Sequence, residues 1–162
     1  MKKAITFITL FALVLVTLCS CLDTGDTQDQ GSGSASPGNS SSSTLGDYDV
    51  VIESCRIASD YLGEPIVIVK YKFTNNDDDP AAFMWSVDSA AFQGGIGLNE
   101  CYIAADSANY SSANQTKEIK KGATLSVEVA YELNDSTTDV EVEVSEYFSF
   151  SNKKIVKTFT IK

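Results

Sequence analysis

The chain has 162 residues, of which 43% are hydrophobic, so it is long enough for one domain of ordinary size with its own core. Its 22 acidic residues outnumber the 12 basic ones, and the net charge of −10 becomes −12 if Lys2 and Lys3 are removed with a signal sequence, leaving 10 basic residues; such a charge disfavours nucleic acid as a partner. The absence of histidine excludes Ser-His-Asp and Cys-His catalysis and histidine zinc sites, so the composition favours a protein that is not an enzyme and uses no cofactor or metal.

The first 20 residues have the pattern of a bacterial lipoprotein signal peptide. Two lysines precede an apolar run over residues 4–18, which is shorter than the roughly 20 residues of a transmembrane helix. The run ends in Leu-Cys-Ser-Cys, which resembles a lipobox and implies a diacylglyceryl group on Cys21 after cleavage behind Ser20. Cys19 does not fit that role, because Leu18 before it is too large for the cleavage pocket. The alternative is an ordinary secretory signal with an unrelated cysteine.

Residues 21–45 are interpreted as the lipidated cysteine followed by a flexible linker. Residues 22–44 are rich in Gly, Ser and Asp and show no apolar periodicity. Such a segment cannot bury enough apolar surface to offset its ordering entropy, so we expect it to be disordered. The domain over residues 46–162 would then be held off the extracytoplasmic face of the cell membrane by the lipid on Cys21.

The first half of the domain predicts four strands, over residues 50–58, 66–73, 83–87 and 98–104. In the second of these, apolar side chains occupy one face throughout, and Ile66 and Ile68 begin the opposite face. In the third, the apolar residues Phe83, Trp85 and Val87 occupy every second position. A tryptophan at the centre of such a strand is typical of a sandwich core, so we expect Trp85 to be buried.

The second half predicts three more strands, over residues 123–133, 140–144 and 155–161, the last two joined by a turn at residues 151–153. In the clearest strand, apolar residues from Leu125 to Leu133 alternate with polar or small ones, a period of two. Outside the signal, no segment shows a 3.6-residue apolar repeat. About seven strands that suit antiparallel pairing predict an all-β, immunoglobulin-like sandwich, with a small barrel as the alternative.

Several short motifs occur in a characteristic order, namely Asp60-Tyr61-x-Gly63-x-Pro65, Tyr71-x-Phe73-Thr74-Asn75-Asn76, Phe83-Met84-Trp85, Phe92-Gln93-x-Gly95 and Tyr131-x-Leu133. Together they resemble a domain-of-unknown-function family of Gram-positive surface lipoproteins, the one numbered five-zero-six-seven. From about Gly46 onward, the resemblance implies a telokin-like, immunoglobulin-type sandwich outside the cytoplasm. It implies no activity, because the family has no established catalytic residues.

Cys55 and Cys101 are the two thiols that remain once the signal is removed and Cys21 is acylated. An even pair in an exported domain suggests a disulfide. The sequence favours two buried free thiols to the same degree. Nucleophilic use is disfavoured, because there is no histidine and Arg56 is the only obvious basic neighbour.

The acidic residues favour structural interpretations over catalytic ones. Residues 75–79, Asn-Asn-Asp-Asp-Asp, fail as a calcium loop because Pro80 stands where the loop needs glycine and Ser86 where it needs glutamate. An acidic turn is favoured, and a weak ion site near Asp77 and Asp79 stays open. The pairs Glu128/Glu132 and Glu141/Glu143 are interpreted as the solvated faces of strands rather than as glycosidase acids.

Two polar loops are predicted to form the contact surface, because binding residues concentrate in loops. One contains Phe92, Gln93, Gly94 and Gly95, and the other, over residues 106–116, is centred on Tyr110. An aromatic platform formed by Trp85, Phe92 and Tyr61 is an alternative to burial of Trp85. The favoured function is a non-catalytic binding module for an envelope or extracellular protein or glycan. The alternatives are a carboxylate-based hydrolase or inhibitor-like effector, and a purely structural envelope lipoprotein.

Overall fold

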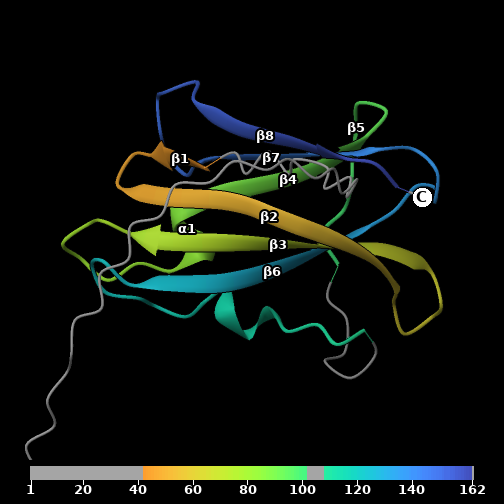
Figure 1. Cartoon of the computed structure of the whole chain (residues 1–162), viewed down its shortest axis with the longest axis horizontal. Coiled ribbons are helices and arrows are strands. Elements are labelled where there is room, and N and C mark those ends of the chain that lie inside the picture. The colour runs from red at the N-terminus through yellow and green to blue at the C-terminus, as the bar shows by residue number, and fades with distance from the viewer. Residues whose placement is uncertain (1–41, 102–107, 162) are drawn as a thin grey trace, which may run out of the picture. The chain divides into compact units, whose positions relative to one another are not determined.

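The computed structural model describes residues 42–101 and 108–161, which form two antiparallel four-stranded sheets (Figure 1). The first sheet has the order β1-β2-β3-β6 and the second the order β5-β4-β7-β8. The elements are β1 (Ser42–Leu45), β2 (Tyr48–Ser59), β3 (Pro65–Asn75), α1 (Phe83–Ser86), β4 (Val87–Gln93), β5 (Ile96–Gly97), a 3-10 turn η1 (Ser112–Asn114), β6 (Thr124–Glu132), β7 (Val140–Glu146) and β8 (Lys154–Phe159). The predicted all-β class is confirmed, and the two sheets form a β-sandwich.

The core lies between the two sheets, and strand β3 explains how it forms. One face of β3 contributes Val67, Val69, Tyr71 and Phe73 to the inter-sheet core, where they meet the inward side chains of β6 and β7. The other face contributes Ile66 and Ile68 to a smaller cluster with Cys101, Tyr110 and Ala130. Because both faces are covered over residues 66–69, β3 is apolar on both sides of the pleat there, whereas Lys70 and Lys72 follow on the outer face.

Five of the predicted strands correspond to β2, β3, β6, β7 and β8. The described residues also contain three strands that the sequence did not predict, β1, β4 and β5, so that they hold eight strands where about seven were expected. Strand β1 lies inside the segment that was assigned to the linker, and its Leu45 is fully buried in the core. The ordered domain therefore begins by residue 42.

The predicted strand over residues 83–87 is wrong, because residues 83–86 form the single helical turn α1. Three hydrogen bonds hold this turn: the backbone N–H groups of Trp85 and Ser86 donate to the Ala82 carbonyl, at 3.1 Å each, and the Ser86 hydroxyl donates to it at 2.9 Å. In a helix, positions i, i+3 and i+4 share a face, so Phe83, Ser86 and Val87 point inward. Trp85 points outward, and its expected burial is also wrong, since its exposed fraction is 68%.

The predicted strand over residues 98–104 is not formed by the part that the structure describes. The Leu98 N–H donates to the Ala91 carbonyl in the second sheet, whereas the Cys101 N–H donates to the Ala130 carbonyl in the first. The segment therefore crosses from one sheet to the other and closes the side of the sandwich between β4 and β6. Residues 102–104 lie outside the described residues.

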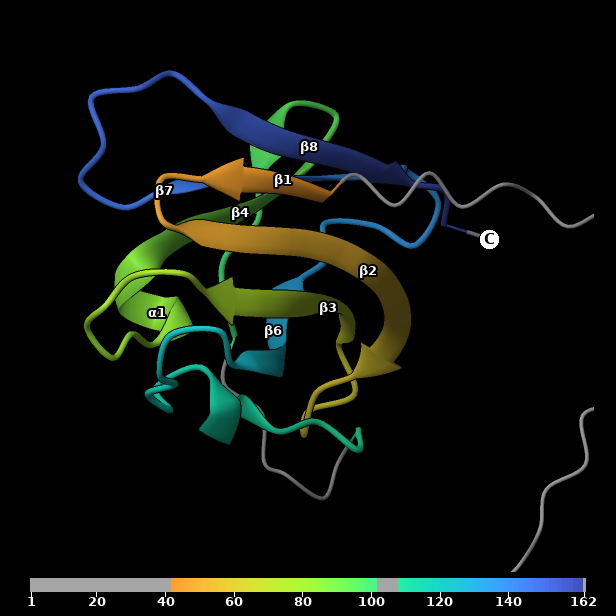
Figure 2. The ribbon, with the colours of Figure 1, turned by 60° about the vertical axis from the view of Figure 1, so that its left-hand side comes forward.

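Strand β6 is the edge of the first sheet, and the segment that contains η1 runs beside it (Figure 2). The amide nitrogen of Asn114 donates to the Ser126 carbonyl at 2.9 Å, and that of Gln115 donates to the Glu128 carbonyl at 2.7 Å. Covering an edge in this way prevents pairing with another chain. The outer edge of β6 is therefore not a docking edge.

The loop between β6 and β7 depends on Asp135, whose carboxylate accepts hydrogen bonds from the Thr137 N–H at 2.7 Å, the Thr138 N–H at 2.6 Å and the Thr137 hydroxyl at 2.9 Å. These bonds stabilise the ionised form and lower the pKa of Asp135 well below its ordinary value of 3.8. A folded-state pKa below the unfolded one stabilises the fold above about pH 4, and this contribution is lost as the pH falls through the folded pKa.

We therefore expect Asp135→Asn to lower the free energy of unfolding at pH 7 and to flatten its decline below pH 4. Urea unfolding at a series of pH values measures both effects. Asp139→Asn, at an exposed carboxylate of the same loop, is the matched control and should leave the wild-type pH profile in place. If the free energy of unfolding falls as steeply below pH 4 in the Asp135→Asn variant as in the wild type, this role of Asp135 is contradicted.

Candidate functional site

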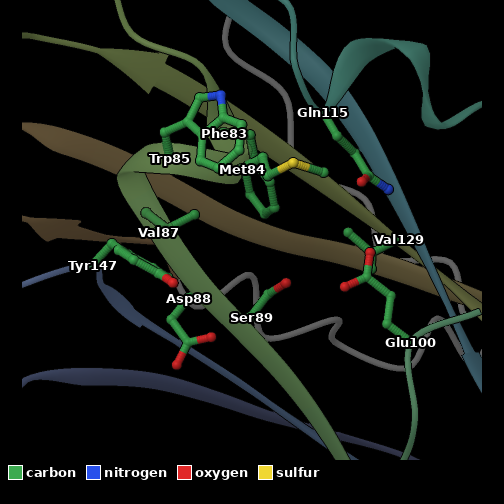
Figure 3. Close-up of a pocket in the computed structure, with 10 residues that line it drawn as sticks. All are labelled: Phe83, Met84, Trp85, Val87, Asp88, Ser89, Glu100, Gln115, Val129 and Tyr147. Atoms are coloured by element: carbon green, nitrogen blue, oxygen red, sulfur yellow. The ribbon is translucent and has the colours of Figure 1, made fainter.

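A pocket of about 260 Å³ opens on the side of the sandwich between β4 and β6 (Figure 3). Helix α1 bounds it at one end, and the crossing segment that contains Glu100 bounds it at the other. Its floor consists of the apolar side chains of Phe83, Val87 and Val129, which belong to the core. The other residues that line it are Met84, Trp85, Asp88, Ser89, Glu100, Gln115 and Tyr147.

The aromatic part of the pocket wall continues into a second hollow. Figure 3 shows Trp85 and Tyr147 on the side of the pocket opposite Glu100 and Gln115. A hollow of about 340 Å³ adjoins it, lined by Asp88, Ser145, Glu146, Tyr147 and Phe148. Phe148 is 90% exposed and contacts the Tyr147 ring edge-on, with the ring centroids 4.6 Å apart. Large exposed aromatic side chains around a concavity are typical of a contact surface.

The charged groups of the two hollows are acidic. Glu100 lines the first hollow, Glu146 lines the second, and Asp88 lines both, whereas among the described residues no Lys or Arg lines either one. Partial desolvation raises the pKa of Glu100, because an ionised carboxylate loses hydration there. The combination of exposed aromatic rings and carboxylates suits a ligand that carries a positive charge.

Asp88 and Glu100 do not form a catalytic pair. Successive residues of a strand point to opposite faces, and the Ser89 hydroxyl faces inward, where it accepts a hydrogen bond from the Tyr131 hydroxyl at 3.0 Å. Asp88 therefore points to the outer face of the second sheet, and Figure 3 shows it on the other side of β4 from Glu100. Burial raises the pKa of Tyr131 to about 12, so its hydroxyl stays protonated and donates this bond.

The predicted binding loop at residues 92–95 is the tight turn between β4 and β5. Gly94 and Gly95 have φ values of 58° and 79°, which a two-residue hairpin of this type requires and which glycine adopts without strain. Phe92 is half-buried, and Gln93 is 3% exposed. The Gln93 side chain therefore stabilises the fold from inside and is not available as a surface contact.

The second predicted loop also turns inward at its centre. Tyr110 is buried beside Ile66 and Ile68, and its hydroxyl accepts a hydrogen bond from the Gln115 amide at 3.0 Å. Its prediction as an exposed contact is therefore wrong. Residues 106 and 107 of this loop lie outside the described residues.

The structure does not bring Trp85, Phe92 and Tyr61 together as a platform. Trp85 lies in α1, which leads into β4; Phe92 lies near the far end of that strand, and Tyr61 lies in the turn between β2 and β3 of the other sheet. Tyr147 and Glu100 join Trp85 instead, and the sequence analysis did not select either of them. Glu100 lay inside the predicted strand over residues 98–104 but was not selected as a site residue, and Tyr147 belongs to no motif. Only packing brings residues 85, 100 and 147 to one pocket.

Cys55 and Cys101 are free thiols on opposite faces of the first sheet. Cys55 packs against the inter-sheet core, whereas Cys101 belongs to the outer cluster with Ile68 and Ala130. The disulfide alternative is therefore wrong. Burial raises the pKa of both thiols, that of Cys101 to about 11 with help from nearby Glu132, Asp60 and Glu100, which disfavours the reactive thiolate.

We expect both thiols to be alkylated by iodoacetamide in denaturant without any reductant, and to react slowly in the native protein because they are packed and protonated. Intact mass spectrometry counts the added groups. Reduction before alkylation is the control and should add none beyond the number already found. A requirement for reductant would show that Cys55 and Cys101 are bridged.

The acidic turn after β3 is a structural element. Asn75 is fully buried, and its amide nitrogen donates to the carbonyls of Asp79 at 2.8 Å and Ile119 at 2.9 Å. Lys121 forms an ion pair with Asp78 at 2.6 Å. Within residues 42–101 and 108–161, no group of three or more acidic or cysteine side chains is placed to hold a metal ion.

The other carboxylates noted in the sequence lie on separate surfaces. Glu128 forms an ion pair with Arg56 at 2.5 Å, and Glu143 forms one with Lys154 at 2.6 Å. Glu132 and Glu141 are exposed. The described part of the chain contains no helix that is long and apolar enough to cross a membrane. Cys21, the predicted signal and the predicted tether up to residue 41 lie outside the described residues.

The comparisons with known proteins concern the family and the fold. A family model described as a domain of unknown function (DUF5067) matches residues 24–146. A conserved hypothetical protein from Bacillus anthracis has a similar crystal structure, with a TM-score of 0.51 and 16% sequence identity over 76% of this chain and 93% of that one. A functionally unknown protein from Listeria monocytogenes EGD-e has a TM-score of 0.49 and 11% identity, over 75% of this chain and 81% of that one. No curated protein matches the chain. At 16% identity, the Bacillus structure supports the fold alone.

Proposed function

The chain belongs to the family of domains of unknown function DUF5067, and we propose that it is an extracytoplasmic, membrane-anchored binding module without catalytic activity. The proposal assigns the anchor to a lipid on Cys21 and the sandwich to the immunoglobulin-like, telokin-like class. It assigns binding to the pocket between β4 and β6. The partner is an envelope or extracellular protein or glycan.

The exposure of Trp85 is the observation that carries this proposal. The helical turn α1 packs Phe83 into the core and turns Trp85 to solvent, beside a pocket that Tyr147 extends. Exposed aromatic rings of this size are the side chains that most often dominate binding energy at interfaces. A fold that needed Trp85 only for packing would have buried it.

The side-chain chemistry favours binding over catalysis. Asp88 and Glu100 point to opposite faces of β4, so they cannot flank one bond as a pair of glycosidase acids does. The raised pKa values of Cys55 and Cys101 also disfavour a thiolate nucleophile. The hydrolase alternative depends on Glu100 as a general acid, and loss of envelope hydrolysis in a Glu100→Gln variant would replace our proposal with it.

The anchor is tested by labelling the full chain with an alkyne analogue of palmitate in a bacterial host. Cys21→Ala should abolish the label. Cys19→Ala is the control and should keep it, because Cys19 would be removed with the signal. Labelling that survives in the Cys21→Ala variant would overturn the anchor assignment without affecting the binding site.

The binding site is tested with residues 22–162, which retain both sheets and the whole core. The domain is immobilised and cross-linked to envelope fractions as the wild type, as Trp85→Ala and as the control Tyr61→Ala, whose side chain is 69% exposed against 68% for Trp85. A specific component should be captured by the wild type and by Tyr61→Ala but lost from Trp85→Ala. Equal capture by all three would refute the pocket assignment, and capture of nothing would favour a purely structural lipoprotein.

A further inference from the structure

Strand β4 has a short unpaired edge that faces the pocket. In an antiparallel ladder, successive residues point their N–H and C=O groups to alternate sides. The Tyr147 N–H donates to the Ser86 carbonyl, so the N–H and C=O groups of even-numbered residues in this strand point toward β7. The Leu98 N–H donates to the Ala91 carbonyl, so the N–H and C=O groups of odd-numbered residues point away from β7. Ser89 is one of these.

The free length of this edge is one residue. On one side of Ser89, the Val87 N–H is bonded to the Phe83 carbonyl at the end of α1. On the other side, the Ala91 carbonyl is bonded to Leu98. Among the described residues, neither the N–H nor the C=O of Ser89 has a backbone or side-chain partner on the side away from β7. The pocket lies beside this edge, and one residue of an extended chain bound there would form two hydrogen bonds with Ser89.

The side chain of such a residue would enter the pocket. Cross-strand partners place their side chains on the same face of a sheet, and the Ser89 side chain faces inward to Tyr131. The partner of Ser89 would therefore point its side chain between Trp85 and Glu100 (Figure 3). Aromatic rings and a carboxylate, with no Lys or Arg in the lining, select a long cationic side chain.

We propose that the pocket binds an extended peptide segment, which forms one β-bridge with Ser89 and places a lysine or arginine side chain between Trp85 and Glu100. This inference rests on the proposed binding function and names its ligand class. The acidic surface, with a net charge of −10 for the whole chain, attracts a basic partner over long range and disfavours an acidic one.

The probe is the peptide acetyl-Thr-Val-Lys-Val-Thr-amide, titrated into residues 22–162. Trp85 is the only tryptophan of the chain, so its emission reports on the pocket directly. We expect saturable binding that weakens about tenfold when norleucine replaces the lysine, because the charge contacts are lost. Methylation of the lysine amide nitrogen should weaken binding about fivefold, because the donor to the Ser89 carbonyl is lost.

A protein variant distinguishes recognition of the lysine charge from nonspecific binding of the peptide. Glu100→Gln should weaken the lysine peptide about tenfold and leave the norleucine peptide unchanged. Glu64→Gln is the matched control, since Glu64 is an exposed carboxylate in the turn between β2 and β3, and it should bind like the wild type. Circular dichroism confirms that both variants fold.

The outcomes distinguish this inference from the proposed function. If the methylated peptide and the norleucine peptide bind as tightly as the parent, or if no peptide binds, the peptide inference is overturned. Trp85-dependent capture of an envelope component would still support the binding module in that case. If Trp85→Ala captures everything that the wild type captures, the proposed function itself fails.

Discussion

Phe83→Ala is expected to lower the free energy of unfolding by about 3–5 kcal/mol, because it removes a large aromatic side chain from the core and leaves a cavity. Phe83 is 2% exposed, and its ring lies 5.2 Å from the Tyr71 ring and 5.7 Å from the Phe73 ring, centroid to centroid. Urea unfolding followed by circular dichroism measures the change.

Trp85→Ala is the matched variant and should cost less than about 1 kcal/mol, because the side chain it removes is mostly exposed. Both residues are large and aromatic, but the helical turn buries the Phe83 side chain and exposes the Trp85 side chain. If residues 83–87 formed a strand, both side chains would lie on one buried face and both substitutions would be severe. A large loss in Trp85→Ala would therefore contradict the helical turn and the exposed site.

Gln93→Ala is expected to lower the free energy of unfolding by about 2–3 kcal/mol, because it leaves several partly buried polar groups without partners. The Gln93 side-chain nitrogen donates to the carbonyls of Asp135 at 3.0 Å and Thr138 at 2.8 Å. Its oxygen accepts from the N–H groups of Asn134 at 2.8 Å and Asp135 at 3.3 Å. One buried amide thus holds the loop between β6 and β7 against β4.

Gln93→Met separates these hydrogen bonds from packing, because methionine fills a similar volume without donors or acceptors. It should lose nearly as much stability as Gln93→Ala in the same urea experiment. Wild-type stability in Gln93→Met would mean that the amide acts only by filling space.

The strands were predictable where a period of two repeats over several residues, as from Leu125 to Tyr131 and from Val140 to Val144. Residues 83–87 were ambiguous, because Phe83 and Val87 are spaced to share a face in a strand and also in a single helical turn. The hydrogen bonds of Trp85 and Ser86 to the Ala82 carbonyl decide between the two. No periodicity over five residues contains that information.

The site was less predictable than the strands, because it is assembled from distant segments. Trp85, Glu100 and Tyr147 each lie at the end of an element or between elements. The crossing of residues 98–101 between the sheets depends on bonds to Ala91 and Ala130, which are long-range contacts. The sequence indicated an acidic protein and predicted contact loops around Gln93 and Tyr110, but the side chains of these two residues are buried and hydrogen-bonded inside the fold.

The backbone amide of Ser89 provides the most direct test of the binding site between β4 and β6. Residue-resolved hydrogen exchange by NMR should find this amide unprotected in the free domain, because it has no partner among the described residues. With the lysine peptide bound, we predict that its exchange slows at least about tenfold while the Trp85 indole signal shifts. Unchanged exchange at Ser89 in the presence of a saturating, bound peptide would contradict the account.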